Sequence, residues 1–271
     1  MSRSRKNKSP KIKSSPKSFV MPQMAIKQRL ILMGCFVVLA LLLYFQCFGF
    51  GYVLDDKLVI SDNNFTKNGF AGLWDILTTD SFQGYFGEQK NLLQGGRYRP
   101  LSIMTFAVEH QFFGLNSTVS HVINVILYGF GGYICFITLK RLFKDKESSS
   151  GIYFSLAFLS SVLFLLHPIH TEAVANIKGR DEIMSFIFSM LALLYALRYV
   201  DTSNKNELIK MVAAFFMGIL SKENTITFLA IIPFGLILFR KGFMKSTTKV
   251  GMTLFATTIV YLIIRYLVMG Y

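Results

Sequence analysis

Long runs without a charged residue are the feature that most limits what this chain can fold into. Leu30–Leu54 and Gln111–Leu139 contain no Asp, Glu, Lys or Arg, and residues 148–171 carry only two His among ionisable side chains. Each run is at least as long as the roughly 20 residues that cross about 30 Å of hydrocarbon. Because 52% of the 271 residues are also hydrophobic, the sequence predicts an all-α integral membrane protein.

Hydropathy predicts about seven transmembrane helices, and three of them look short. The expected spans lie near 30–51, 121–140, 151–167, 182–198, on both sides of 221–224, and at 249–267. Short spans leave their polar ends below the membrane surface, so we expect the turns at 179–182 and 221–224 to line a water-filled depression.

A long first external loop, 52–119, is expected to carry short helices at the membrane interface. Pro100 is typical of a helix start, and apolar residues then recur at helical spacing. This pattern predicts a helix lying along the membrane surface. Its apolar residues are Leu101, Met104, Val108, Phe112 and Leu115.

The net charge of +14 indicates topology rather than nucleic-acid binding. The tail, 1–29, holds nine Lys or Arg and no acid, and is predicted to be disordered. Further basic residues follow the second, fourth and sixth predicted spans. The positive-inside rule therefore places the N-terminus and these links in the cytoplasm, in a multi-pass protein of a bacterial inner membrane or the ER membrane. No nucleic-acid partner is expected.

Four links on the predicted external side concentrate the polar chemistry. They read "VLDDKLVISDNN" at 53–64, "GGRYRPL" at 95–101, "HPIHTEAVANIKGRDE" at 167–182 and "SKEN" at 221–224. Charges against the ends of spans are costly and usually have a task. Acids beside cations at a membrane surface suit a lipid-phosphate-linked donor, because cations bind the leaving phosphate and a carboxylate takes the acceptor's proton.

Two of these links offer a base and an anion site, each with a simpler alternative. Asp55 and Asp56 repel one another, which can raise one pKa and leave a usable base, although a solvated boundary explains them equally well. Arg97 and Arg99 offer forks for phosphate or carboxylate, or anchors for lipid headgroups.

The other two links hold further candidates. His167, His170 and Glu172 are ordinary metal ligands, but the spacing is a weak signal and Pro168 interrupts the helix between the histidines. The remaining site candidates fall in two groups. One Arg and two acids open the fourth predicted span, where the acids suit a helix N-terminus. A Lys–Glu pair interrupts a stretch that is otherwise uncharged. These are Arg180, Asp181, Glu182, Lys222 and Glu223.

Taken together, these motifs resemble the N-terminal membrane half of the GT-C glycosyltransferases over about 30–240. The nearest group is the TPR-containing protein O-mannosyltransferases with their bacterial relatives, and "HVINVILY" at 121–128 adds to the resemblance. It implies an inverting glycosyltransferase that moves a sugar, typically mannose, from a polyprenyl- or dolichyl-phosphate to a protein Ser or Thr on the external or lumenal face. The implied partners are membrane lipid, the lipid-linked donor and an acceptor protein or peptide; a divalent metal is a possible cofactor.

The resemblance also implies roles for individual residues. Asp55 or Asp56 is the expected base or acceptor-site carboxylate. The expected phosphate-binding residues are Arg97, Arg99, Arg180 and Lys222.

The sequence departs from the family in length. Such enzymes have about a dozen spans followed by TPR helices, whereas this sequence ends at Tyr271 without a TPR pattern, so we expect an incomplete or shortened GT-C-like fold over 30–271. Two alternatives remain. Intramembrane charges also mark transporters and channels, although here they gather on one side rather than at the midplane. A non-catalytic partner of a glycosyltransferase is the other.

Overall fold

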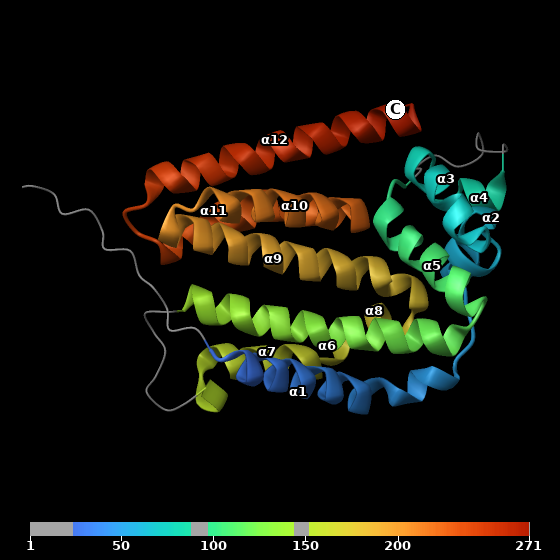
Figure 1. Ribbon diagram of the computed structural model, residues 1–271, viewed down its shortest axis with the longest axis horizontal. Helices are drawn as coiled ribbons and strands as arrows, with labels where there is room; N and C mark the ends of the chain where they lie inside the picture. Colours follow the sequence, from blue (N-terminus) through green and yellow to red (C-terminus); the bar gives the residue numbers. More distant parts are fainter. Residues whose placement is uncertain (1–23, 88–96, 144–151, 271) are drawn as a thin grey trace, which may run out of the picture.

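The structure is a computed structural model that describes residues 24–87, 97–143 and 152–270, and this part of the chain is helical without a strand. Seven helices form an elongated bundle (Figure 1). They are α1 (Ile26–Tyr44), α6 (Ser117–Leu142), α7 (Leu156–Leu166), α9 (Arg180–Thr202), α10 (Lys205–Ser221), α11 (Phe228–Phe239) and α12 (Met244–Met269).

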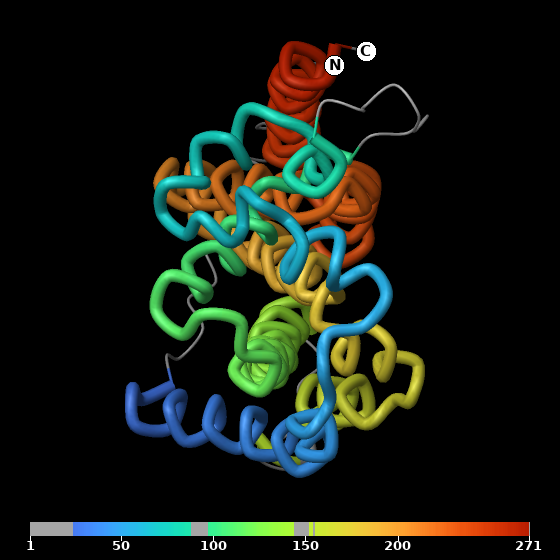
Figure 2. Tube along the Cα trace, turned by 90° about the vertical axis from the view of Figure 1, so that its right-hand side faces the viewer, coloured from blue at the N-terminus to red at the C-terminus, as the bar shows by residue number. Residues whose placement is uncertain are grey.

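Short helices cover one end of this bundle and link its members. Helix α1 continues into η1 (Phe45–Gly49), and the long loop 52–119 contains η2 (Lys57–Ser61), α2 (Asn64–Lys67), η3 (Gly69–Gly72), α3 (Leu73–Thr78), α4 (Gln83–Phe86) and α5 (Pro100–Phe113). The later links contain η5 (Ile152–Phe154), η6 (Pro168–His170), α8 (Thr171–Ala175), η7 (Ile177–Gly179) and η8 (Glu223–Thr227). Figure 2 looks onto the covered end, where α2 to α5 lie across the bundle.

Four helices of the described residues are long and apolar enough to cross a membrane. They are α1 with η1, α6, α9 with η7, and α12, at the places predicted for the first, second, fourth and seventh spans. A fifth follows if α7 and the residues up to Ala175, bent by 51° at Pro168, count as one span. The predicted seven are not confirmed, because α10 has 17 residues with a polar first turn and α11 has 12.

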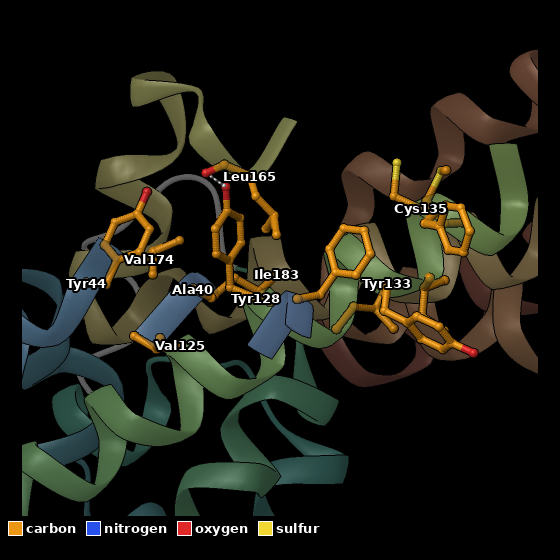
Figure 3. Close-up of a cluster of buried hydrophobic side chains, with 14 of the residues drawn as sticks. Ala40, Tyr44, Val125, Tyr128, Tyr133, Cys135, Leu165, Val174 and Ile183 are labelled. Atoms are coloured by element: carbon orange, nitrogen blue, oxygen red, sulfur yellow. Dashed lines mark hydrogen bonds between the residues drawn. The ribbon is translucent and has the colours of Figure 1, made fainter. Parts of the chain in front are cut away.

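Helix α6 is the centre of one half of the bundle and packs against α1, α7 and α9. Its Gly129 lets α1 approach closely, since an added Cβ would lie 2.6 Å from the Val37 Cα. The core between these helices mixes aliphatic and aromatic side chains (Figure 3). Tyr128 donates its hydroxyl hydrogen to the carbonyl of Leu165 at 3.0 Å, which satisfies a buried polar group.

The other half packs α9 against α10, α11 and α12. A buried ion cluster joins α6, α9 and α11 at the end of the bundle away from α2–α5. Arg240 donates to the Asp201 carboxylate at 2.8 Å and to the carbonyl of Arg141, while the Arg141 guanidinium lies 2.7 Å from Asp201. Partnered charges of this kind fix which helix ends meet.

The short helices of the long loop 52–119 have their own small core, which includes Ile103 and Phe106 of α5. Asn63 ties the loop together, because its side chain caps α2 and donates to the carbonyls of Leu58 and Ser81. Helix α5 begins at Pro100 as predicted, and Phe112 on its apolar stripe is exposed. That α5 lies along a membrane surface stays a prediction.

Candidate functional site

All four links that were predicted to be external contribute to one charged cluster, and Asp55 of the first link joins it through Lys178 of η7. We use "charged cluster" for three cations and four acids that are linked by successive ion pairs, each with an N–O distance of 4.0 Å or less. Its members are Asp55, Arg99, Lys178, Asp181, Glu182, Lys222 and Glu223.

Arg99, directly before α5, is the most firmly held member. Its guanidinium forms a fork with Glu223, with N–O distances of 2.7 and 2.6 Å, and its third nitrogen donates to Asp181 at 2.8 Å. Burial alone would raise the pKa of Glu223, but the Arg99 hydrogen bond, a backbone hydrogen bond and the charges of Arg99 and Lys222 together hold that pKa below its ordinary value. Such bidentate pairs fix geometry as well as charge.

Asp181 is the centre of the cluster. Its side chain is only 4% exposed and lies within ion-pair distance of all three cations: Arg99 at 2.8 Å, Lys222 at 3.8 Å and Lys178 at 4.0 Å. Asp181 stands in the first turn of α9, where the helix dipole favours a negative charge. A shared carboxylate therefore gathers cations from three separate segments.

Each cation also has one partner of its own. Arg99 has Glu223, Lys222 contacts Glu182, and Lys178 lies 3.5 Å from Asp55. These private partners are more exposed than Asp181. The exposed fractions of the side chains are 52% for Asp55, 43% for Glu182 and 36% for Glu223.

The two adjacent aspartates of the first loop have different surroundings. Asp56 is fully buried, and its two oxygens accept hydrogen bonds from the backbone amides of Val53 and Lys178 at 2.9 and 2.8 Å. Burial raises the pKa of Asp56 despite these amides. Asp55 is instead the accessible carboxylate beside Lys178. Asp56 therefore holds two backbone segments together, while Asp55 stays exposed to solvent.

Arg180 is not a member of the charged cluster, because its side chain points into the protein. Its fully buried guanidinium pairs with Glu109 at 2.8 Å, donates to the Asn124 side chain at 2.6 Å and lies over the Phe106 ring. This network joins α5, α6 and α9. The phosphate role of Arg180 stays a prediction, although the enclosed position of the guanidinium favours a structural part.

The turn η7 is held from several sides, and this fixes Lys178. Asn124 donates to the carbonyl of Ile177 at 2.9 Å, and Asp56 accepts from the Lys178 amide. At Gly179 an added Cβ would lie 2.2 Å from the carbonyl oxygen of Ala173, so the close packing of α8 against η7 requires glycine. Sequence reasoning did not nominate Lys178, although it is a cation inside the same polar run.

A cavity of about 400 Å³, here named the inner cavity, opens beside the cluster. Its lining includes the charged side chains of Lys178, Asp181, Glu182 and Lys222, together with His170, Glu172 and Asn176. The apolar part of the lining comes from α6, α7, η6 and α9, with Tyr128, Phe164, Ile169, Ile183 and Phe186. The Phe164 and Phe186 rings stack at 4.7 Å. The shape suits an amphiphile with an anionic head.

The remaining candidates lie around these features. Arg97 faces Phe82 and lines a much smaller cavity of about 20 Å³, on the loop side of Lys178 and Asp181. His167 is exposed and accepts a hydrogen bond from the amide of Ile169. His170 packs its ring 4.3 Å from Phe164.

The metal hypothesis gains no support from this arrangement. Within the described residues, His167, His170 and Glu172 do not form a group of three that could hold a metal ion, and no other such group is found there.

Comparison with known proteins confirms the predicted resemblance: the homologues are TMTC protein O-mannosyl-transferases. A protein O-mannosyl-transferase of Caenorhabditis elegans is 33% identical over 187 residues, 69% of this chain. The human protein O-mannosyl-transferase TMTC1 is 32% identical over 157 residues, 55% of the chain, and mouse TMTC3 is 29% identical over 184 residues, 67% of the chain.

The similarity covers a small share of each relative. The aligned part of this chain spans 25% of the nematode protein, 16% of human TMTC1 and 19% of mouse TMTC3. No family model and no solved structure matches the chain.

Proposed function

We propose that the chain forms the donor site of a protein O-mannosyltransferase, binding mannose linked to a polyprenyl or dolichyl phosphate. The observation that carries this proposal is that Lys178 and Lys222 line the same cavity as the aromatic side chains of Phe164 and Phe186. The cations match the phosphate, and the walls match an isoprenoid tail. The names of the homologues support mannose and a protein acceptor.

In this proposal the donor's phosphate lies between Lys178 and Lys222, beside the N-terminus of α9. A helix N-terminus favours an anion through its dipole and its unpaired amides. The isoprenoid lies along Phe164 and Phe186. Arg99 does not contact the phosphate in this proposal; its guanidinium holds the carboxylates of Asp181 and Glu223 in place.

Asp55 is the base that the geometry favours. Both oxygens of Asp56 are occupied by backbone amides and no part of it is exposed, whereas Asp55 is accessible beside Lys178. Asp55 would accept the proton of an acceptor Ser or Thr hydroxyl. The hydroxyl oxygen then bonds to the sugar's C1 while the bond from C1 to the phosphate oxygen breaks, with inversion, and Lys178 and Lys222 stabilise the leaving phosphate.

The chain spans a quarter or less of the relatives, so transfer is proposed as the reaction that this donor site serves. We further propose that the charged cluster faces the external or lumenal side and the N-terminus the cytoplasm. The basic links on the opposite end of the bundle, which include Lys205 and Lys210, support this orientation.

Binding of a short polyprenyl phosphate to the purified protein in detergent tests the donor site. Lys178→Gln and Lys222→Gln should each weaken binding about tenfold without loss of folding, as charge-assisted contacts are worth about 1.5–3 kcal/mol. Lys210→Gln, at the other end of the bundle, is the control. Equal affinity in all four proteins would refute the site. Transfer of labelled mannose from its lipid phosphate to a Ser/Thr peptide tests the reaction.

A further inference from the structure

The charged cluster contains more acid than base, which is unexpected in a site for an anion. Its four carboxylates exceed its three cations by one, and every cation contacts two of these acids. A phosphodiester entering this arrangement would add a negative charge to an already negative cluster. Like charges at this distance repel, so one carboxylate must give way before a phosphate can reach a lysine.

Of the cluster's acids, only Asp181 and Glu182 line the inner cavity. Asp181 is 4% exposed and contacts three cations, so its removal would separate α5, η7 and η8. Glu182 is 43% exposed and contacts a single cation, Lys222. Glu182 is therefore the acid that can leave at least cost.

The neighbouring carboxylate has an unused acceptor. Asp181 Oδ1 is buried and has no hydrogen-bond partner within the described residues, although Lys222 Nζ lies 3.8 Å away. Lys222 instead donates a hydrogen bond to Glu182. Without Glu182, Lys222 can move toward Asp181 and satisfy that oxygen.

We propose that Glu182 occupies the phosphate position on Lys222 in the empty site and is displaced when the donor binds. The exchange replaces one singly charged carboxylate by one singly charged phosphodiester, so the charge of the cavity stays constant. Both anions lie at the N-terminus of α9, which stabilises either of them. This inference rests on the proposed donor site and assigns Glu182 a positioning part within it.

The same competition acts after transfer. When the sugar has left, Glu182 returns to Lys222 and displaces the lipid phosphate. Glu182 thus weakens the hold of the site on both donor and product and keeps Lys222 in place between turnovers.

Binding of a short polyprenyl phosphate, as its singly charged methyl diester, to purified variants tests the exchange. Glu182→Gln removes the competitor, so it should bind the probe about two- to fivefold more tightly than the parent, as expected for a partly exposed ion pair. Glu207→Gln is the matched control. It removes the same charge from an ion pair with Lys210 outside the cavity and should leave affinity unchanged.

A double variant shows whether the effect runs through Lys222. In a Lys222→Gln background, Glu182→Gln should no longer improve binding, because the two side chains act as a pair. Thermal unfolding of each variant confirms that it is folded. Equal or weaker binding by Glu182→Gln, with the parent binding normally, would overturn the exchange. A parent that binds no polyprenyl phosphate would instead refute the donor site itself.

Discussion

The backbone amide of Lys178 donates a hydrogen bond of 2.8 Å to the carboxylate of Asp56, 122 residues earlier in the chain. This bond ties the loop 52–119 to the turn from which the Lys178 side chain reaches the inner cavity. The other Asp56 oxygen accepts from Val53, so the carboxylate is fully used in joining two segments. The position of Asp55 beside Lys178 depends on this junction.

Replacing Asp55 or Asp56 by asparagine should therefore give two different defects. Asp56→Asn places an amide group against one of two backbone N–H donors, and a buried unpaired donor costs about 1–3 kcal/mol. We expect a lower melting temperature together with reduced transfer. Asp55→Asn should leave the melting temperature unchanged and lower turnover on the order of 10²-fold or more, as loss of a general base does.

Thermal unfolding and labelled-mannose transfer, measured on the same preparations, separate these outcomes. Full turnover in Asp55→Asn would remove Asp55 from the mechanism. A stable Asp56→Asn variant with no activity would reverse the assignment and make Asp56 the base.

The packing of Gly179 gives a purely steric prediction. Gly179→Ala drives a Cβ against the Ala173 carbonyl, so either α8 or η7 must shift. We expect destabilisation of about 1–3 kcal/mol, the usual cost of overpacking a core position, together with weaker polyprenyl phosphate binding because Lys178 moves. Gly235→Ala is the control, because an added Cβ there meets no atom within 4 Å. Similar melting temperatures for the two variants would contradict this view of η7.

The ion pair of Glu223 with Arg99 predicts a defined pH dependence. Because the pKa of Glu223 is lower in the folded protein than in the unfolded chain, its stabilisation is full above the unfolded pKa and is lost as pH falls through the folded one. The melting temperature of Glu223→Gln should thus lie below that of the parent at pH 7, and the gap should close in acid below the usual glutamate range. A gap that stays constant from pH 7 to pH 3 would show that the pair does not stabilise the fold through charge.

Sequence patterns predicted the long helices well because hydropathy over some 20 residues is a local property. Helices α1, α6, α9 and α12 lie where spans were expected. The span count was harder to predict, because α10 has 17 residues with a polar first turn and α11 has only 12 residues. Whether such short helices cross a membrane depends on neighbours rather than on their own composition.

The site was predicted as a set of residue types but not as a set of partners. Arg99 and Glu223 are 124 residues apart, and only the fold shows that they pair. Arg180 and Asp181 are adjacent, yet consecutive residues of a helix point about 100° apart, so one enters the protein and the other the cluster. The pattern of charges in the sequence could not predict which of the two side chains enters the protein.

Membrane orientation is the prediction on which the placement of the site depends. Asn64 is an exposed residue of α2 near the charged cluster's end of the bundle, and Asn206 is an exposed residue at the start of α10. Single cysteines at these positions, in a variant lacking Cys35, Cys47 and Cys135, can be labelled with a membrane-impermeant maleimide. The basic links predict that Asn206→Cys reacts from the same side as a cysteine in the N-terminal tail, and Asn64→Cys from the opposite side.

The comparison is made in sealed vesicles before and after permeabilisation, which exposes both faces. A tail variant, Ser4→Cys, serves as the internal reference, so the result does not depend on which way the vesicles face. If Asn64→Cys labels together with Ser4→Cys, the charged cluster lies on the side of the tail. A lumenal or external acceptor could then not reach Asp55, and the inner cavity would have to serve a substrate on the cytoplasmic face.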